Sequence, residues 1–212
     1  MFQRLELLER RSIMARSKGR HAKAMSVANE MGFGTYNTRR NLPPHSGRRR
    51  REANFVGAFL KAFMAEARDG CWCGRHFAVP ACGVADCVVF RLDETEPEHA
   101  ATHLMAFEAK LTDWRKALAQ AYRYRYYADA SIIILPAGSA RVAIDNRHLF
   151  RQCGVGLWTF DPESGVVRRR IAAKKRSPLS ARKREQALLR IESRALQLRK
   201  LREEAEPLKQ CR

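Results

Sequence analysis

The stretch from His103 to Pro136 constrains the fold of this chain more than any other part of the sequence. Leu104 to Phe107 is a short apolar run, and Ile132 to Leu135 is a second one, which Pro136 closes. Between the two runs, apolar residues recur at the three- and four-residue spacing of one helix face: Trp114, Ala117, Leu118, Ala121, Tyr122 and Ala128. A strand, a crossover helix and a second strand form a βαβ unit, so we predict that the two strands are parallel.

An acid and an amine lie at the end of the first predicted strand. Because alternate residues of a strand share a face, Glu108 and Lys110 project to the same side, with Ala109 turned away. One interpretation is a solvated ion pair, which contributes little free energy. The other is a catalytic pair, with Glu108 as an oxygen ligand of Mg²⁺ and Lys110 near an attacking water or a scissile phosphate.

A second acid precedes another predicted strand. In the segment Gly83 to Phe90, Asp86 lies at the start of an apolar run. A carboxylate that is buried without a partner costs several kcal/mol or becomes protonated. Asp86 therefore needs a partner, and a divalent ion shared with Glu108 would be one.

Together these motifs resemble the PD-(D/E)XK nuclease superfamily, which has the restriction-endonuclease-like fold. The similar region covers about residues 51–160. Its elements are Gly-x-x-Asp, an apolar strand ending in Glu-x-Lys about twenty residues later, a helix with Trp, Ala and Gln, and an apolar strand closed by proline. One departure is that Ala85, and not proline, precedes Asp86. The resemblance implies an α/β core with a mixed central β-sheet flanked by helices.

The resemblance also implies roles for individual residues. Asp86 and Glu108 would bind Mg²⁺, with Mn²⁺ as an alternative, and Lys110 would be the motif lysine. Some members carry a glutamine on the following helix, which matches Gln120, and a glutamate on the helix before the sheet, for which Glu52 is the candidate.

The basic residues are distributed unevenly along the chain. The net charge is +19. Residues 1–51 hold 13 Lys and Arg against 3 Asp and Glu, residues 52–167 hold 12 against 14, and residues 168–212 hold 16 against 5. A near-neutral core between two basic arms predicts a polyanionic partner, and we favour nucleic acid over solvated tails without a partner. No apolar run approaches the length of a membrane span, and no secretory signal is visible, so we expect a cytoplasmic protein without a membrane partner.

The region before the nuclease-like core is predicted to be a basic extension. Residues 1–32 are rich in helix formers, and a helix-turn-helix with its turn at residues 17–20 is conceivable. Residues 32–51 carry several helix breakers and are predicted to be a linker. The linker ends in four basic residues, which are phosphate-contact candidates or a solvated junction: Arg48, Arg49, Arg50 and Arg51.

The segment at residues 52–68 is predicted to be a helix with a core-facing apolar stripe, formed by Phe55, Val56, Phe59, Leu60 and Phe63. Glu52 lies at the edge of that stripe. Glu52 either interacts favourably with the helix dipole near the N-terminus or provides an outer carboxylate of the site. Glu66 is a weaker candidate for the second role.

Four cysteines lie between residues 70 and 87: Cys71, Cys73, Cys82 and Cys87. With His76 nearby, they suggest zinc. However, structural zinc sites favour pairs separated by two to four residues, and this spacing fits poorly. We favour reduced thiols that act as small core residues.

The helix predicted at residues 113–129 interleaves tyrosines with Arg123 and Arg125. Its spacing assigns Tyr122 to the core. The two arginines are either surface residues or phosphate contacts.

After Pro136 we predict a short strand at residues 141–144, a short helix at 145–153 ended by Gly154, and an edge hairpin around residues 161–165. A basic helix is predicted at residues 179–206. It could clamp a duplex, pair with another helix or remain free.

We therefore predict a basic helical extension and linker at residues 1–50, a nuclease-like domain at 51–170 and a basic C-terminal helix at 171–212. The expected activity is metal-dependent hydrolysis of phosphodiester bonds, on DNA rather than RNA. The alternatives are a non-catalytic nucleic-acid-binding protein with the same fold and a basic scaffold of a larger assembly. A homodimer is compatible with either.

Overall fold

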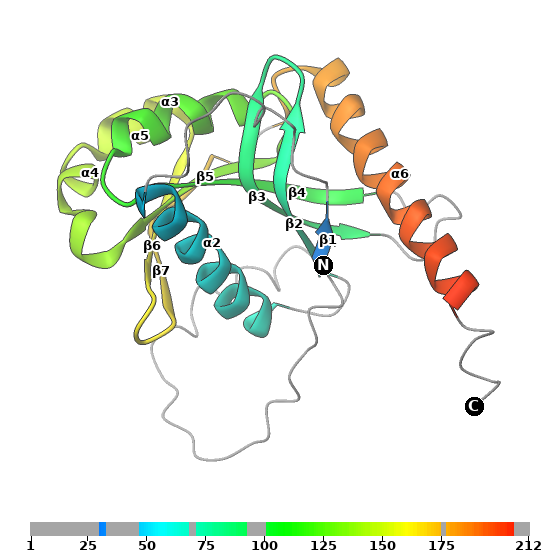
Figure 1. Ribbon diagram of the computed structural model, residues 1–212. Helices are drawn as coiled ribbons and strands as arrows, with labels where there is room; N and C mark the ends of the chain where they lie inside the picture. The colour runs from blue at the N-terminus through cyan, green and yellow to red at the C-terminus, as the bar shows by residue number, and fades with distance from the viewer. Residues whose placement is uncertain (1–29, 33–46, 68–70, 93–100, 175–176, 206–212) are drawn as a thin grey trace.

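The computed structural model describes residues 30–32, 47–67, 71–92, 101–174 and 177–205 (Figure 1). The elements are β1 (Glu30–Gly32), α2 (Gly47–Glu66), β2 (Cys71–Val79), β3 (Gly83–Leu92), β4 (Ala101–Ala109), α3 (Trp114–Tyr124), β5 (Ala130–Pro136), the 3₁₀ turn η3 (Ala137–Ser139), α4 (Arg141–Asp145), α5 (Arg147–Cys153), β6 (Gly156–Asp161), β7 (Val166–Ile171) and α6 (Ala181–Ala205). The predicted α/β class is confirmed.

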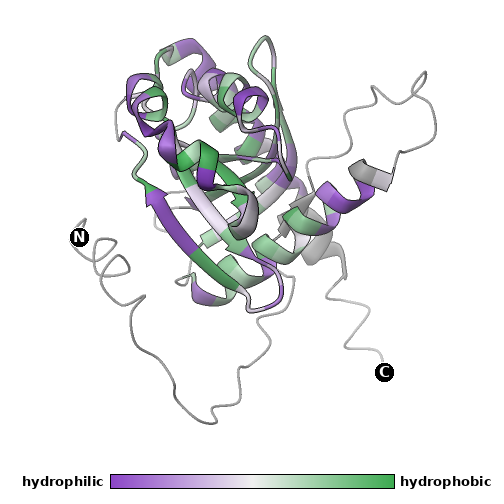
Figure 2. Ribbon diagram, turned by 90° about the vertical axis from the view of Figure 1, so that its left-hand side faces the viewer, coloured by the Kyte–Doolittle hydropathy of each residue, from purple (hydrophilic) through white to green (hydrophobic). Residues whose placement is uncertain are grey.

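The strands form one mixed sheet in which they follow each other in sequence order. β2, β3 and β4 are joined in antiparallel fashion, β4, β5 and β6 are parallel, and β6 and β7 are antiparallel. The three-residue β1 adds to the β2 edge in parallel. The parallel pairing of β4 and β5 across α3 confirms the predicted βαβ unit. At the opposite edge, β7 is hydrophilic along the half that holds residues 168–170 (Figure 2).

Helices cover both faces of the sheet, and Figure 1 shows α2 apart from the group formed by α3, α4 and α5. On the α2 face, four residues of the predicted stripe, Phe55, Val56, Phe59 and Leu60, are buried against β-strand side chains that include Phe107, Trp158 and Phe160. The fifth residue of the stripe, Phe63, packs against the same cluster and is partly buried. On the other face, α3, α5 and part of α6 cover a second cluster, which contains Leu104, Ala106, Ile133, Leu157 and Ile171. This second face carries the polar residues discussed below.

The helix α3 has a clear local origin. The side chain of Asp113 accepts a hydrogen bond from the backbone N–H of Lys116 at 3.0 Å, which caps the N-terminus. The predicted apolar stripe is buried with one exception: Tyr122 is 39% exposed, so its assignment to the core was wrong. Tyr124, three residues after Ala121, takes the buried position. Tyr122 lies about 100° around the helix from Ala121, at the edge of the stripe.

Three other local predictions need correction. Residues 141–144 form the helix α4 and not a strand, because a short apolar run fits a helical turn as well as a strand. Residues 30–32, expected to be helical, form β1, and residues 47–51, expected to be a linker, are the first turn of α2. The predictions for residues 1–29 and 33–46, including the helix-turn-helix, lie outside the described residues.

The C-terminal part of the described chain is bound to the sheet. The predicted α5 ends at Gly154, whose φ of 67° is a left-handed conformation that suits glycine, and the β6–β7 hairpin forms as predicted. Ala187 and Ile191 of α6 are buried in the core, and Arg184 forms an ion pair with Asp129 at 2.8 Å. The first half of α6 is therefore part of the packed domain. Within the described ranges, none of the helices has both the length and the apolar character of a membrane span.

Candidate active site

The site is built where β3 and β4 separate. Their ladder runs from the Leu92–Ala101 pair to the Cys87–Phe107 pair. One residue further along β3, the carboxylate of Asp86 accepts a hydrogen bond from the backbone N–H of Ala109 at 2.8 Å. At the point where the two strands diverge, the side chain of Asp86 thus accepts the backbone hydrogen bond that a carbonyl of β3 would accept in a continued ladder.

The same position is irregular on the β2 side. The pairing of β2 with β3 skips His76 and Asp86, and His76 has φ of 55°, which is uncommon for a residue with a side chain. The pleat changes sides here: Ala85 lies in the α3-side cluster, whereas Cys87, two residues later, lies in the α2-side cluster. This irregularity sets Asp86 apart from the regular alternation of β3.

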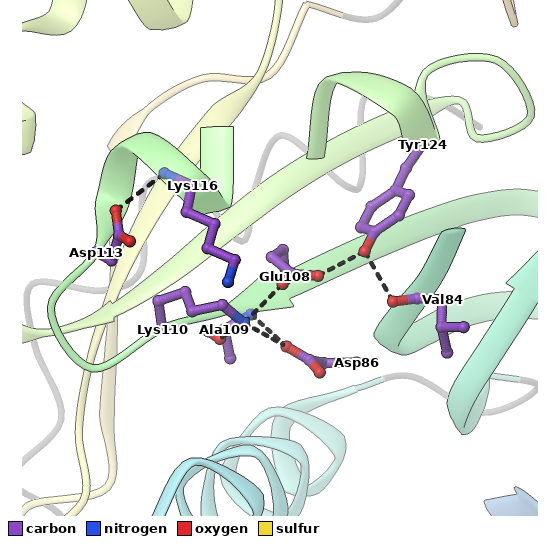
Figure 3. A network of polar contacts seen from close by, with 8 residues as sticks. All are labelled: Val84, Asp86, Glu108, Ala109, Lys110, Asp113, Lys116 and Tyr124. Carbon is purple, nitrogen blue, oxygen red and sulfur yellow. Dashed lines mark hydrogen bonds and ion pairs between the residues drawn. The ribbon is translucent and has the colours of Figure 1, made fainter. Parts of the chain in front are cut away.

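Glu108 is held on the α3 face at the end of β4. Glu108 is 1% exposed, and both of its carboxylate oxygens have hydrogen-bond partners (Figure 3). Oε1 accepts a hydrogen bond from Lys110 Nζ at 2.7 Å, and Oε2 lies 2.5 Å from the hydroxyl of Tyr124. The same hydroxyl lies 2.8 Å from the backbone carbonyl of Val84. Tyr124 therefore connects β3 and β4 across the gap between them.

The ammonium of Lys110 lies among oxygen atoms from both strands. Its Nζ is 2.7 Å from Glu108 Oε1, 3.1 Å from the carbonyl oxygen of Ala109 and 3.9 Å from Asp86 Oδ2. The side chain of Lys110 is 13% exposed and that of Asp86 is 30% exposed, so the site opens to solvent on the Asp86 side. The structure thus brings together the three predicted side chains, Asp86, Glu108 and Lys110.

Burial and charge shift the pKa values in this cluster. Burial is the main cause that raises the pKa of Glu108, from 4.5 to about 7; the charge of Asp86 adds to it, and Lys110 and Tyr124 oppose it. Burial also raises the pKa of Asp86, against the effects of Lys110 and the Ala109 N–H. For Lys110, burial lowers the pKa, but the two carboxylates outweigh it and the net shift is upward. Glu108 therefore changes its protonation state near neutral pH.

The donor atoms suit a hard divalent cation. Carboxylates of Asp86 and Glu108 and the carbonyl of Ala109 form an all-oxygen set, which Mg²⁺ and Mn²⁺ prefer. No group of three or more His, Cys, Asp and Glu side chains suited to a metal occurs among the described residues. A magnesium ion does not need one, because it is usually held by one or two carboxylates and completes its shell with water and substrate phosphate.

The two outer residues of the prediction lie at different positions. Glu52 is half-buried on α2, and its charge raises the pKa of both Asp86 and Lys110, so it is within electrostatic reach of the site. Gln120 lies one helical turn before Tyr124 on α3. Its Oε1 is buried and has no hydrogen-bond partner among the described residues. In the described part of the chain, the hydrogen bonds of the Asp86 and Glu108 carboxylates do not include Gln120.

The predicted nucleic-acid contacts are dispersed. Arg50 and Arg51 are exposed on the first turns of α2, and Arg123 is exposed near Gly83. Arg125 is half-buried, donates to the Cys153 carbonyl at 2.6 Å and lies 5.9 Å from the Tyr122 ring centre. The side chains of Arg48 and Arg49 lie outside the described residues. The contacts of Arg125 join the ends of α3 and α5.

Two residues near the site were missed by the sequence analysis. Tyr124 could have been found, because a buried glutamate needs a second partner and Tyr124 falls on the apolar face of the next helix. Lys116 also comes from α3, and in Figure 3 its side chain extends from the first turn toward Lys110 and Glu108. The sequence pattern that could have identified Tyr124, a place on the apolar face of the helix, does not exist for an exposed lysine.

The cysteines are distributed through the core. Cys73 and Cys87 are buried in the α2-side cluster and Cys82 in the α3-side cluster, whereas Cys71 and Cys153 are half-buried. Burial raises the pKa of the Cys82 and Cys87 thiols, which keeps them protonated and unreactive. Their positions fit the predicted role as small core residues.

Comparison with known proteins gives no relative: no family model, no curated protein and no solved structure matches this chain.

Proposed function

We propose that this chain is a metal-dependent nuclease of the PD-(D/E)XK type, which hydrolyses phosphodiester bonds of nucleic acid, with DNA favoured over RNA. The observation that supports it most is the ammonium of Lys110 held between Glu108 and Asp86 at neighbouring strand ends. A cation already occupies the space between the two acids. The three side chains are those of the motif that the sequence resembles.

Asp86, Glu108 and the carbonyl of Ala109 would hold the ion. When bound, Mg²⁺ or Mn²⁺ would stabilise negative charge on the phosphate and lower the pKa of a bound water. Glu108 has to lose its proton before it can act as a ligand, and its pKa of about 7 places this step near neutral pH. Activity should therefore rise from pH 6 to pH 8.

Lys110 would act on the substrate side of the acids. Its ammonium stays positively charged at neutral pH despite burial, because the neighbouring carboxylates hold its pKa above the ordinary value. It can donate to a phosphate oxygen and stabilise the charge that develops there, or orient the attacking water. Tyr124, which contacts the other oxygen of Glu108, would keep that carboxylate in position when Lys110 turns from the acids toward the substrate.

The net charge of +19 supports a polyanionic substrate. No residue distinguishes DNA from RNA, so the preference for DNA depends on the family resemblance. The same charge favours the alternative, a non-catalytic nucleic-acid-binding protein.

One incubation separates the two functions. The protein is mixed with plasmid, single-stranded DNA or RNA in the presence of Mg²⁺, Mn²⁺ or EDTA. We expect cleavage that EDTA abolishes and that Asp86→Ala and Lys110→Ala reduce at least a hundred-fold, about 3 kcal/mol in transition-state stabilisation. Nucleic-acid binding should be retained. Asp145→Ala and Lys61→Ala, exposed residues of the same charges, serve as matched controls. Binding without cleavage under all conditions would support the alternative.

A further inference from the structure

A small basic hollow lies at the β7 edge of the sheet, away from the acidic site. Its volume is about 210 Å³. It is lined by Ile144, Arg147, Arg151, Arg170, Ile171 and Ala172. Three of these six residues are arginines and none is acidic, and the two isoleucines and the alanine complete the wall.

Local structure directs the three arginines to one place. Arg147 and Arg151 are four residues apart on α5 and so share a helix face. The pairing of β6 with β7 shifts register between Leu157 and Trp158, which leaves Arg170 as the additional residue of a bulge. Bulges redirect side chains, and here Arg170 Nε donates to the buried Thr159 hydroxyl at 3.2 Å. Arg170 therefore lies on the α5 side of the sheet.

No residue of the described part of the chain neutralises the positive charges of the hollow. The side chains of Arg147 and Arg151 form no hydrogen bond or ion pair with any described residue, and the side chain of Arg170 forms a hydrogen bond there with a neutral hydroxyl only. Like charges gathered around one hollow repel each other unless an anion joins them. The planar guanidinium binds phosphate through paired hydrogen bonds, so phosphate is the anion that this arrangement suits best.

The register of the sheet relates the hollow to the acidic site. Glu108 pairs with Ile133, Ile133 with Leu157, and Leu157 with Ile171. Ile133, Leu157 and Ile171 all lie in the α3-side cluster, and Glu108 contacts Tyr124 on that face. Three strand spacings separate the two sites, which is roughly 14 Å. Phosphates of one strand rise 3.4 Å per nucleotide along the duplex axis and also wind around it, so a direct distance of roughly 14 Å corresponds to about two nucleotides.

We infer that the hollow formed by Arg147, Arg151 and Arg170 binds a backbone phosphate of the nucleic-acid substrate, about two nucleotides from the scissile bond. This inference rests on the proposed function and adds a contact that fixes the strand relative to the acidic site. A phosphate contact positions the substrate and carries no sequence information.

The test uses the full-length double variant Arg147→Gln/Arg151→Gln, with Arg141→Gln and Arg182→Gln, exposed arginines outside the hollow, as controls. The Kd for a 20-base-pair duplex in Ca²⁺ is measured as a function of salt. We expect the Kd to rise about ten-fold at 0.1 M salt. The slope of log K against log salt should become shallower by about 1. The controls should bind as the wild type does.

Position is tested by neutral methylphosphonate substitutions along one strand. A substitution about one to three nucleotides from the cleavage position should weaken binding by the wild type but not by the double variant. An unchanged Kd and salt slope in the double variant would overturn the inference and leave the proposed function intact. The inference would also be overturned if inorganic phosphate raised the melting temperature of the wild type but not that of the double variant, while both proteins bound DNA equally well. The hollow would then bind free phosphate and not the nucleic acid. Absence of cleavage by the wild type would overturn the proposed function together with the position of the phosphate contact relative to the scissile bond.

Discussion

The two faces of the sheet differ in the chemistry of their buried residues. On the α2 face, Phe59 packs against Phe63, Phe107, Trp158 and Phe160, with ring centres 5.5 to 6.4 Å apart. On the α3 face lie the three buried polar residues of the described chain, namely Glu108, Ser131 and Thr159, each with a hydrogen-bond partner. An aromatic face is stable through dense packing alone, whereas burying polar groups costs free energy of folding. A role in binding would explain why the α3 face keeps them. We infer that stability depends mainly on the α2 face and chemistry on the α3 face.

The largest effect should come from the aromatic face. Phe59→Ala removes a fully buried ring that touches four others, so we expect a loss of about 3 to 5 kcal/mol in the free energy of unfolding. Denaturant unfolding measures it, with the exposed Val142→Ala as control. Cleavage per folded molecule should stay within two-fold. A cleavage defect in the folded fraction would contradict the division between the faces.

A pH-dependent effect should appear on the α3 face alone. The pKa of Glu108 is about 7 in the folded protein and about 4.5 in the unfolded chain, so between these values the folded state holds a proton that the unfolded state has lost. Without metal, this contribution to stability is present below pH 4.5 and is lost as the pH rises toward 7. From pH 5 to 7.5 we expect a loss of roughly 2 kcal/mol.

Unfolding in EDTA across this range measures the slope, and Glu108→Gln should flatten it. Asp86, whose pKa is also raised, has a slope of the same sign and remains in that variant. An equal slope in Glu108→Gln and wild type would show that Glu108 does not carry the effect.

A smaller effect should follow Tyr124→Phe. The substitution removes the hydroxyl between Glu108 and the Val84 carbonyl but keeps the ring, so we expect about a ten-fold loss in kcat, or 1.4 kcal/mol. The hydroxyl lowers the pKa of Glu108, so the acidic limb of the pH–rate profile should move to higher pH. The exposed Tyr122→Phe is the matched control. A loss of rate without a shift of that limb would indicate a structural role only.

The sequence predicted most of the central elements because their patterns are long. The β4–α3–β5 unit, the β6–β7 hairpin and the stripe on α2 each extend over at least two turns or a full strand. Short segments were ambiguous: residues 141–144 fit a strand or a helical turn, and packing decided for the helix. Residues 30–32 depend on pairing with the distant β2, which local patterns do not report.

The candidate site was predictable in part. Glu108 and Lys110 follow from strand alternation, and Asp86 from an acid before an apolar run. The burial of Tyr124 depends on which edge of α3 packs against the sheet. The residue spacing alone did not decide between Tyr122 and Tyr124, which are two residues apart. Arg170 depends on a bulge in β7, and its meeting with Arg147 and Arg151 is set by the packing of α5 on the sheet edge.

The central claim is that Asp86 and Glu108 together hold one divalent ion. Calorimetric titration of the metal-free protein with Mn²⁺ at pH 7.5 tests it most directly, using the wild type, Asp86→Asn, Glu108→Gln and the exposed control Asp145→Asn. We predict one ion per chain in the wild type and the control, and at least a ten-fold weaker affinity in each of the other two variants. Absence of Mn²⁺ binding by the wild type, or equal binding by all four proteins, would contradict the claim.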